Sequence, residues 1–136
     1  IYEDYLKRLT SHLNLSGVKF AGSVSQEDLM AFYQSADLFL CMSEHEGLCI
    51  PLIEAMVSNL PIIAYNSSAV GETLGGGGIL VDKKTYPEIA ELAHYLIGNS
   101  KLRADLTNHQ KNRLRGFSED KVHKGWQEVL KYVDSL

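Results

Sequence analysis

The sequence predicts an α/β domain, in which helices flank a parallel sheet. Short apolar runs of strand length alternate with segments whose apolar residues recur every three or four positions. Strands and helices that alternate in this way are typical of βαβ units, whose strands run parallel. Length and composition agree with one compact domain, because the chain has 136 residues, of which 45% are hydrophobic and 22% charged.

Four apolar runs are predicted to be the strands of this sheet. Val18–Phe20 follows a turn that contains glycine, and Leu38–Met42 has the length of a buried strand. Pro61–Tyr65 begins with proline, which is tolerated at the first residue of a strand because no N–H donor is needed there. A polar loop, residues 66–77, precedes the last predicted strand, Gly78–Val81.

Helical periodicity accounts for most of the remaining N-terminal chain. Tyr2–Leu13 carries an apolar stripe. Ser25 is expected to cap a helix that runs to about Gln34, with Asp28 completing a start that resembles a capping box. Pro51 is expected to be the first residue of the next helix, a position that proline favours.

The C-terminal third is predicted to be helical. A capping box at Thr85–Glu88 begins one helix, Ser100 begins another that runs to about Arg115, and Ser118 caps the last. The last helix has an apolar stripe that is expected to face the core: Val122, Trp126, Val129, Leu130 and Val133.

Charge is unevenly distributed along the chain. The formal net charge of −4 argues against a nucleic-acid binder held by phosphate contacts. Between Phe20 and Asp82 there is no Lys or Arg, whereas this stretch contains eight carboxylates. The basic residues between Lys101 and Arg115 are interpreted as a solvated helix face, with attraction to an anionic membrane surface or to ligand phosphates as the alternative.

The cysteine content and the lack of a leader-like segment suggest a location. Two cysteines cannot form a disulfide framework and fit a reducing setting best. No apolar run has the length of a membrane-spanning helix, and the N-terminus lacks the pattern of a signal peptide. We therefore expect a cytoplasmic protein, which the basic residues would bring to the inner face of the membrane under the alternative interpretation.

Two carboxylates separated by seven residues are the most informative feature. Glu46 follows the predicted strand Leu38–Met42, and Glu54 lies about one turn inside the helix that begins near Pro51. Both are expected to face one crevice at the carboxyl end of the sheet, where ligands of open α/β folds bind. Gly47 permits close approach of the backbone. Carboxylates accept hydrogen bonds from hydroxyl groups and backbone amides donate them, so this site suits a polyhydroxylated ligand.

The pair resembles the Glu-x7-Glu signature of glycosyltransferase family 4 and related GT-B enzymes, and the resemblance extends along most of the chain. Leu29–Asp37 is similar to the family's helix x-L-x-x-x-Y-x-x-A-D. Glu54–Met56 with Pro61–Ala64 resembles its segment E-A-M-A-x-G-x-P-V-V-A, and Glu72 with Gly78–Val81 resembles its closing strand. Three positions depart from the pattern, since the family usually has glycine near residues 49 and 59 and proline at position 71: Cys49, Asn59 and Gly71.

The resemblance implies that residues 1–136 form the Rossmann-like, nucleotide-sugar-binding C-terminal domain of a GT-B enzyme, without its earliest strands and its N-terminal acceptor domain. It implies transfer of a hexose-type unit, with retention, from a nucleoside-diphosphate sugar to a glycan or a lipid-linked acceptor. No metal and no cofactor are implied, because the nucleotide sugar is a substrate.

The resemblance also assigns roles to residues. Glu46 would touch the hydroxyls of the donor sugar in a positioning and electrostatic role, not as a covalent nucleophile. The amides of Gly47, Leu48 and Cys49 would assist it. Glu54 would bind the ribose hydroxyls, and a turn would lie near the base: Gly22, Ser23 and Val24.

The chain alone is expected to be inactive. In the family, a basic pair from an earlier strand neutralises the donor diphosphate, and no residue between positions 20 and 82 can take that role. Two carboxylates without a cation repel a diphosphate. We therefore expect weak donor affinity for this chain alone.

Other interpretations of the same residues remain. Cys41, His45 and Cys49 are four residues apart, but a metal site at that spacing needs one continuous helix, which Gly47 and Pro51 interrupt, so buried cysteines and no metal are expected. A sugar-phosphate synthase or phosphorylase would share the paired carboxylates. A non-catalytic α/β binding module would keep the fold without turnover.

Overall fold

The structure is a computed structural model that describes residues 2–135. Its centre is a parallel sheet of three strands in the order β1-β2-β3. They are β1 (Phe39–Cys41), β2 (Ile62–Tyr65) and β3 (Ile79–Val81). Leu40 pairs with Ile63, which pairs with Ile79. These strands lie inside three of the predicted runs, so the α/β fold with a parallel sheet is confirmed.

The central strand β2 is buried on both faces. Ile62 and Ala64 point to one side and join a cluster with the helices α2 (Gln26–Ser35), α3 (Ile50–Val57) and α4 (Val70–Leu74). Ile63 points to the other side and packs with residues of α5 (Tyr86–Gly98) and α6 (Ser100–Leu114). A parallel strand covered on both faces is apolar throughout, which explains the unbroken run of hydrophobic residues.

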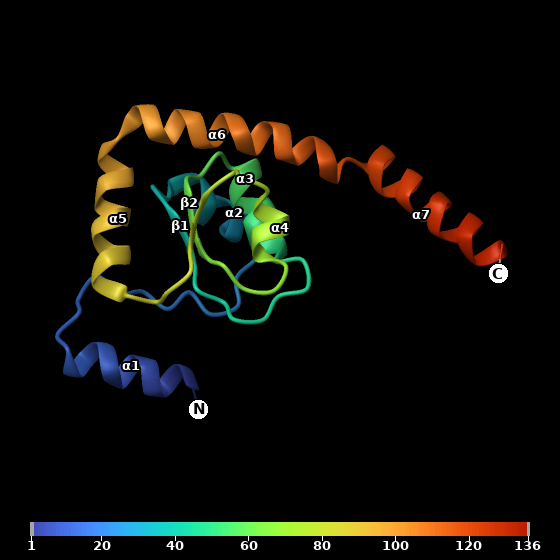
Figure 1. Cartoon of the computed structure of the whole chain (residues 1–136). Coiled ribbons are helices and arrows are strands. Elements are labelled where there is room, and N and C mark those ends of the chain that lie inside the picture. The colour runs from blue at the N-terminus through green and yellow to red at the C-terminus, as the bar shows by residue number, and fades with distance from the viewer. Residues whose placement is uncertain (1, 136) are drawn as a thin grey trace.

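Helix α6 closes the amino end of the sheet. Figure 1 shows it lying across one end, with the loops that follow β1 and β2 at the opposite end. Gln110 of α6 is fully buried, and its Nε2 donates to the carbonyl of Leu60 at 2.7 Å and to that of Gly77 at 2.8 Å. Both carbonyls lie just before a strand. One amide therefore satisfies two backbone groups that the sheet leaves without a donor.

Most of the predicted helix starts agree with the structure. The hydroxyl of Ser25 accepts from the amide of Asp28 at 3.1 Å, which confirms the predicted cap. Helix α3 begins one residue before Pro51, with Cys49 as its N-cap. Thr85 precedes α5, and Ser118 precedes the last helix, as predicted. Neither makes a side-chain capping bond, so the predicted caps were wrong there.

The predicted strand Val18–Phe20 was wrong. This segment has no regular secondary structure, and Val18 and Phe20 are 46% and 36% exposed. A strand exists only as part of a ladder with a neighbour, and no strand between residues 2 and 135 pairs with this segment. The Lys7 ammonium lies 5.8 Å from the centre of the Phe20 ring.

The two terminal helices leave their apolar sides uncovered. Helices α1 (Tyr2–His12) and α7 (Glu119–Asp134) lie apart from the sheet in Figure 1, and α7 leads away from the body after the short turn η1 (Arg115–Phe117). Trp126 is 63% exposed, and the other residues of its stripe are exposed as well. The prediction that this stripe faces the core was therefore wrong. The amphipathic pattern identified an apolar face without identifying what covers it.

Within residues 2–135, no helix combines the length and the apolarity that spanning a membrane requires.

The Gln110 contacts give a test of the fold. Gln110→Met keeps a flexible side chain of similar size but leaves the carbonyls of Leu60 and Gly77 buried without a donor. Each such loss costs about 1–3 kcal/mol. We expect the free energy of unfolding, measured by urea denaturation with circular dichroism, to fall by about 2–4 kcal/mol.

Lys111→Met is the matched control, because the same side chain is introduced at the next, exposed position of α6. An equal loss in both variants would contradict a role for the two hydrogen bonds.

Candidate functional site

Residues 43–49, which we call the acidic loop, connect β1 to α3 at the carboxyl end of the sheet. The segment 67–73, which follows β2, holds this loop in place. The amide of Ala69 donates to the carbonyl of Glu46 at 3.4 Å. Three side-chain hydroxyls donate to other carbonyls of the loop: Ser67 to Ser43 at 2.7 Å, Ser68 to Glu44 at 3.3 Å and Thr73 to Leu48 at 2.6 Å. These bonds fix the backbone of the loop and leave its carboxylates for other partners.

Glu46 is half-buried in this loop. Its carboxylate lies within 4.8 Å of the sulfurs of Cys41 and Cys49. In the described part of the chain, the backbone amides of Gly47, Leu48 and Cys49 have no acceptor. The space above Gly47 is open, since an added Cβ would meet nothing within 4 Å. The predicted combination of a carboxylate and free donors is therefore present in one loop.

Glu54, also half-buried, is held by Tyr33 of α2. The Tyr33 hydroxyl donates to Oε2 of Glu54 at 3.0 Å, and the tyrosine is only 7% exposed. Burial, and then the hydrogen bond to Glu54, raise the pKa of Tyr33 to about 12, so its phenol remains a neutral donor at physiological pH. The sequence showed Tyr33 only as part of the helix motif, and its contact with Glu54 was missed.

The two predicted carboxylates each lie beside a member of one cluster of buried residues. Tyr33 and Cys49 belong to the same packed group of buried residues. Cys49 is 3.8 Å from Cys41, sulfur to sulfur, and both neighbour Glu46. Burial, and then Cys41, raise the pKa of the Cys49 thiol to about 12. The cysteine pair therefore stands beside Glu46, and the Tyr33–Glu54 contact is packed against the same group.

Lys84 contacts the acidic loop from beyond residues 20–82, the stretch without Lys or Arg. The ammonium of Lys84, which follows β3, forms an ion pair of 2.7 Å with Glu44 and lies 4.8 Å from the centre of the Tyr65 ring. The hydrogen bond and the charge of Lys84 lower the pKa of the Glu44 carboxyl. Sequence reasoning missed this contact because 40 residues separate the partners.

Arginine from the basic stretch also has a specific position. Arg113 donates from Nε to the carbonyl of Thr73 at 3.0 Å and from Nη2 to the carbonyl of Glu72 at 2.8 Å. Gly75 lies so close to Arg113 that an added Cβ would meet its Cδ at 2.6 Å. Arg113 therefore braces α4, and this part of the basic stretch is more than a solvated helix face.

The turn that was assigned to the base, Gly22, Ser23 and Val24, is exposed and lies just before α2. Gly22 has a φ of +64°, which favours glycine. Within residues 2–135, no hydrogen bond joins this turn to the acidic loop.

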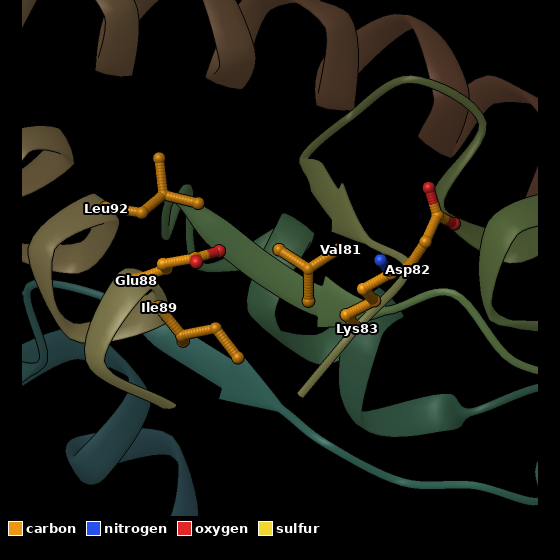
Figure 2. A pocket seen from close by; sticks show the side chains of 6 residues that line it. All are labelled: Val81, Asp82, Lys83, Glu88, Ile89 and Leu92. Atoms are coloured by element: carbon orange, nitrogen blue, oxygen red, sulfur yellow. The ribbon is translucent and has the colours of Figure 1, made fainter. Parts of the chain in front are cut away.

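A separate hollow of 390 Å³ lies beside β3 and α5. Figure 2 shows the apolar side chains of Val81, Ile89 and Leu92 around it, with Glu88 on α5 and Lys83 after β3. Asp82 also lines it, but its Oδ1 already accepts from Asn66 at 2.8 Å. None of the predicted site residues lines this hollow, so it does not carry the predicted chemistry.

Comparisons with known proteins identify relatives of this chain. The family model of the glycosyl transferases group 1 matches residues 2–113. An uncharacterized glycosyltransferase of Haemophilus influenzae is 26% identical over 94% of this chain and 37% of its own length. The O-antigen chain mannosyltransferase B of Escherichia coli is 30% identical over 69% of this chain and 24% of its own length. The chain thus spans little more than a third of these relatives, or less.

Solved structures agree on the fold. The C-terminal domain of a glycosyl transferase group 1 family protein (LpcC) from Francisella tularensis superposes with a TM-score of 0.66 at 25% identity, over 84% of this chain and 60% of that one. The GtfA/B complex gives a TM-score of 0.72 at 22% identity, over 98% of this chain and 28% of that one, and supports the fold alone. With the family match over residues 2–113, these findings show that the chain belongs to the glycosyl transferases group 1 family and has the fold of its C-terminal domain.

Proposed function

We propose that this chain is the donor-binding half of a glycosyltransferase that moves a hexose from a nucleoside-diphosphate sugar to a glycan or a lipid-linked acceptor, with retention of configuration. Several relatives carry names that specify mannose, among them a GDP-mannose:cellobiosyl-diphosphopolyprenol alpha-mannosyltransferase of Xanthomonas campestris. GDP-mannose is therefore the first donor to test. A preceding domain of the same enzyme supplies the acceptor site.

The acidic loop binds the sugar in this proposal. The Glu46 carboxylate accepts hydrogen bonds from sugar hydroxyls, and the free amides of Gly47, Leu48 and Cys49 donate to sugar oxygens. The hydroxyl bonds from segment 67–73 hold the loop before the ligand arrives, so little ordering is needed on binding. Glu46 orients the sugar and stabilises developing positive charge, without forming a bond to it.

Glu54 binds the ribose. One of its oxygens, Oε2, already accepts from Tyr33, which fixes the carboxylate and leaves Oε1 for a ribose hydroxyl. This carboxylate, held by Tyr33 about one turn inside α3, is the observation that carries the proposal. A carboxylate that only stabilised the helix end through its dipole would need no such support from α2.

The diphosphate needs cations, and the two basic side chains that contact the acidic loop and α4 are already engaged. Lys84 is paired with Glu44, and Arg113 is engaged with carbonyls of α4. The basic pair of an earlier strand, which the family resemblance implies, fills this role in the intact enzyme. The isolated chain is therefore expected to bind the donor weakly and to transfer no sugar.

The two carboxylates give a test in the intact enzyme. Glu54→Gln should raise the Kd of GDP about 10–100-fold, since a hydrogen bond to a charged group contributes about 1.5–3 kcal/mol. Glu46→Gln should leave the Kd of GDP unchanged and lower kcat/KM for the sugar donor by a similar factor. Calorimetry with GDP and initial rates with GDP-mannose measure the two effects.

Glu88→Gln is the control, because Glu88 is an exposed carboxylate in the separate hollow. Unchanged binding and rates in both site variants would favour a non-catalytic binding module. Turnover of a sugar phosphate in place of the nucleotide sugar would favour the synthase or phosphorylase alternative.

Tyr33→Phe tests the clamp on Glu54. The ring stays in the core, whereas the hydrogen bond to the carboxylate is lost. We expect the free energy of unfolding to fall by about 1 kcal/mol, and the Kd of GDP to rise about fivefold while kcat with saturating donor stays unchanged.

Tyr86→Phe serves as the reference, because Tyr86 is 65% exposed. A Tyr33→Phe enzyme that loses stability but binds GDP like the wild type would show that Tyr33 has only a structural role.

A further inference from the structure

Three side chains bring metal-ligating atoms together: Cys41 at the end of β1, and Glu46 and Cys49 of the acidic loop. Two sulfurs and a carboxylate oxygen lie within 4.8 Å of one another. The sulfurs are 3.8 Å apart. Two thiolates that bind one Zn²⁺ tetrahedrally, at the usual Zn–S length, are also about 3.8 Å apart. The pair therefore has the spacing of two ligands of one cation.

We propose that Cys41, Cys49 and Glu46 form a binding site for a thiophilic divalent cation of the Zn²⁺ type. Two sulfurs and one carboxylate oxygen supply three ligands, and a water molecule takes the fourth position. A hydrogen bond between the two thiols accounts for the approach of the sulfurs alone. It gives no reason for the carboxylate to lie on the same side.

The backbone at Cys49 explains why the site exists in this chain. Cys49 has φ 57° and ψ 64°, a left-handed conformation that favours glycine. Glycine is also the residue that the related family has near this position. Here a thiol replaces it, and the left-handed backbone places that thiol against Cys41. The ligand pair therefore arises from a departure of this sequence from the family pattern.

The surrounding charge favours a cation. No Lys or Arg occurs between positions 20 and 82, and the nearby Lys84 is paired with Glu44. When the cation binds, each thiol forms a metal–sulfur bond and releases its proton to solvent, so affinity increases with pH. Two thiolates and a carboxylate then balance the double positive charge and leave one negative charge at the site.

Occupation of this site has a consequence that rests on the proposed function. Glu46 is the residue that we propose for the sugar hydroxyls, and a carboxylate bound to a cation cannot accept hydrogen bonds from the sugar with the same oxygen. The cation therefore competes with the donor sugar. It inhibits transfer and takes no part in it.

Cadmium tests the site by spectroscopy, because a Cd²⁺–thiolate bond absorbs in the ultraviolet whether or not the protein has transferase activity. The intact protein is titrated with Cd²⁺ in the presence of a thiol-free reductant. We expect one Cd²⁺ per chain and a thiolate band. Cys41→Ser and Cys49→Gly should lower the affinity at least about tenfold, a loss seen even for outer-shell partners of metal ligands. Glu46→Gln should lower the affinity to a similar extent and keep the band.

Two variants control for damage to the fold. Cys49→Gly introduces the residue that the left-handed backbone prefers, so circular dichroism should show a folded protein. His45→Ala changes an exposed neighbour in the same loop and should bind Cd²⁺ like the wild type. The site would be overturned if the wild-type protein, with both thiols free, showed no thiolate band. It would also be overturned if Cys41→Ser and Cys49→Gly showed a thiolate band as strong as that of the wild type. A disulfide between Cys41 and Cys49 that persisted in the reductant would contradict the cation site as well.

Competition separates this inference from the proposed function. Cd²⁺ should raise the Kd of GDP-mannose for the wild type but not for Cys49→Gly. If Cd²⁺ binds with its thiolate band and donor affinity does not change, the cation site stands and the role proposed for Glu46 fails.

Discussion

Packing of β2 on both of its faces determines where a polar ligand can approach this fold. Ile62, Ile63 and Ala64 have no exposed surface, because helices cover the sheet from either side. Along β2, the backbone groups pair with β1 on one side and β3 on the other, so the unpaired groups nearest to it lie at the strand ends. Gln110 of α6 satisfies two of them at the amino end. At the carboxyl end, the acidic loop keeps unpaired amides close to Glu46, and this is the end at which ligands of open α/β folds bind.

The parts that the sequence predicted correctly are those that depend on local pattern. Apolar runs located β1, β2 and β3 to within one residue, since each run is continuous and flanked by turn residues. The cap at Ser25 was predictable because its partner lies three residues away. The spacing of Glu46 and Glu54 pointed to the loop and to a position about one turn inside α3, where the structure has them.

Contacts between distant segments were not predictable. Tyr33 and Glu54 are 21 residues apart, and Lys84 and Glu44 are 40 apart, so no spacing rule connects them. Val18–Phe20 has the composition of a strand, but pairing depends on a neighbour that composition does not reveal.

Helix α4 was missed because its five residues are too few to show a helical period. Asn59, with φ 56°, stands where the family has glycine, and asparagine is the residue that best replaces glycine there.

The outward position of Trp126 changes what intrinsic fluorescence reports. It is the single tryptophan of the chain, and it sits on α7, away from the sheet. Its indole is in contact with water in the native fold, so melting of the strands alters its emission little. The same indole responds strongly to any surface that covers α7. Tryptophan emission therefore reports on the C-terminal helix and its neighbours, and it reports little on unfolding of the core.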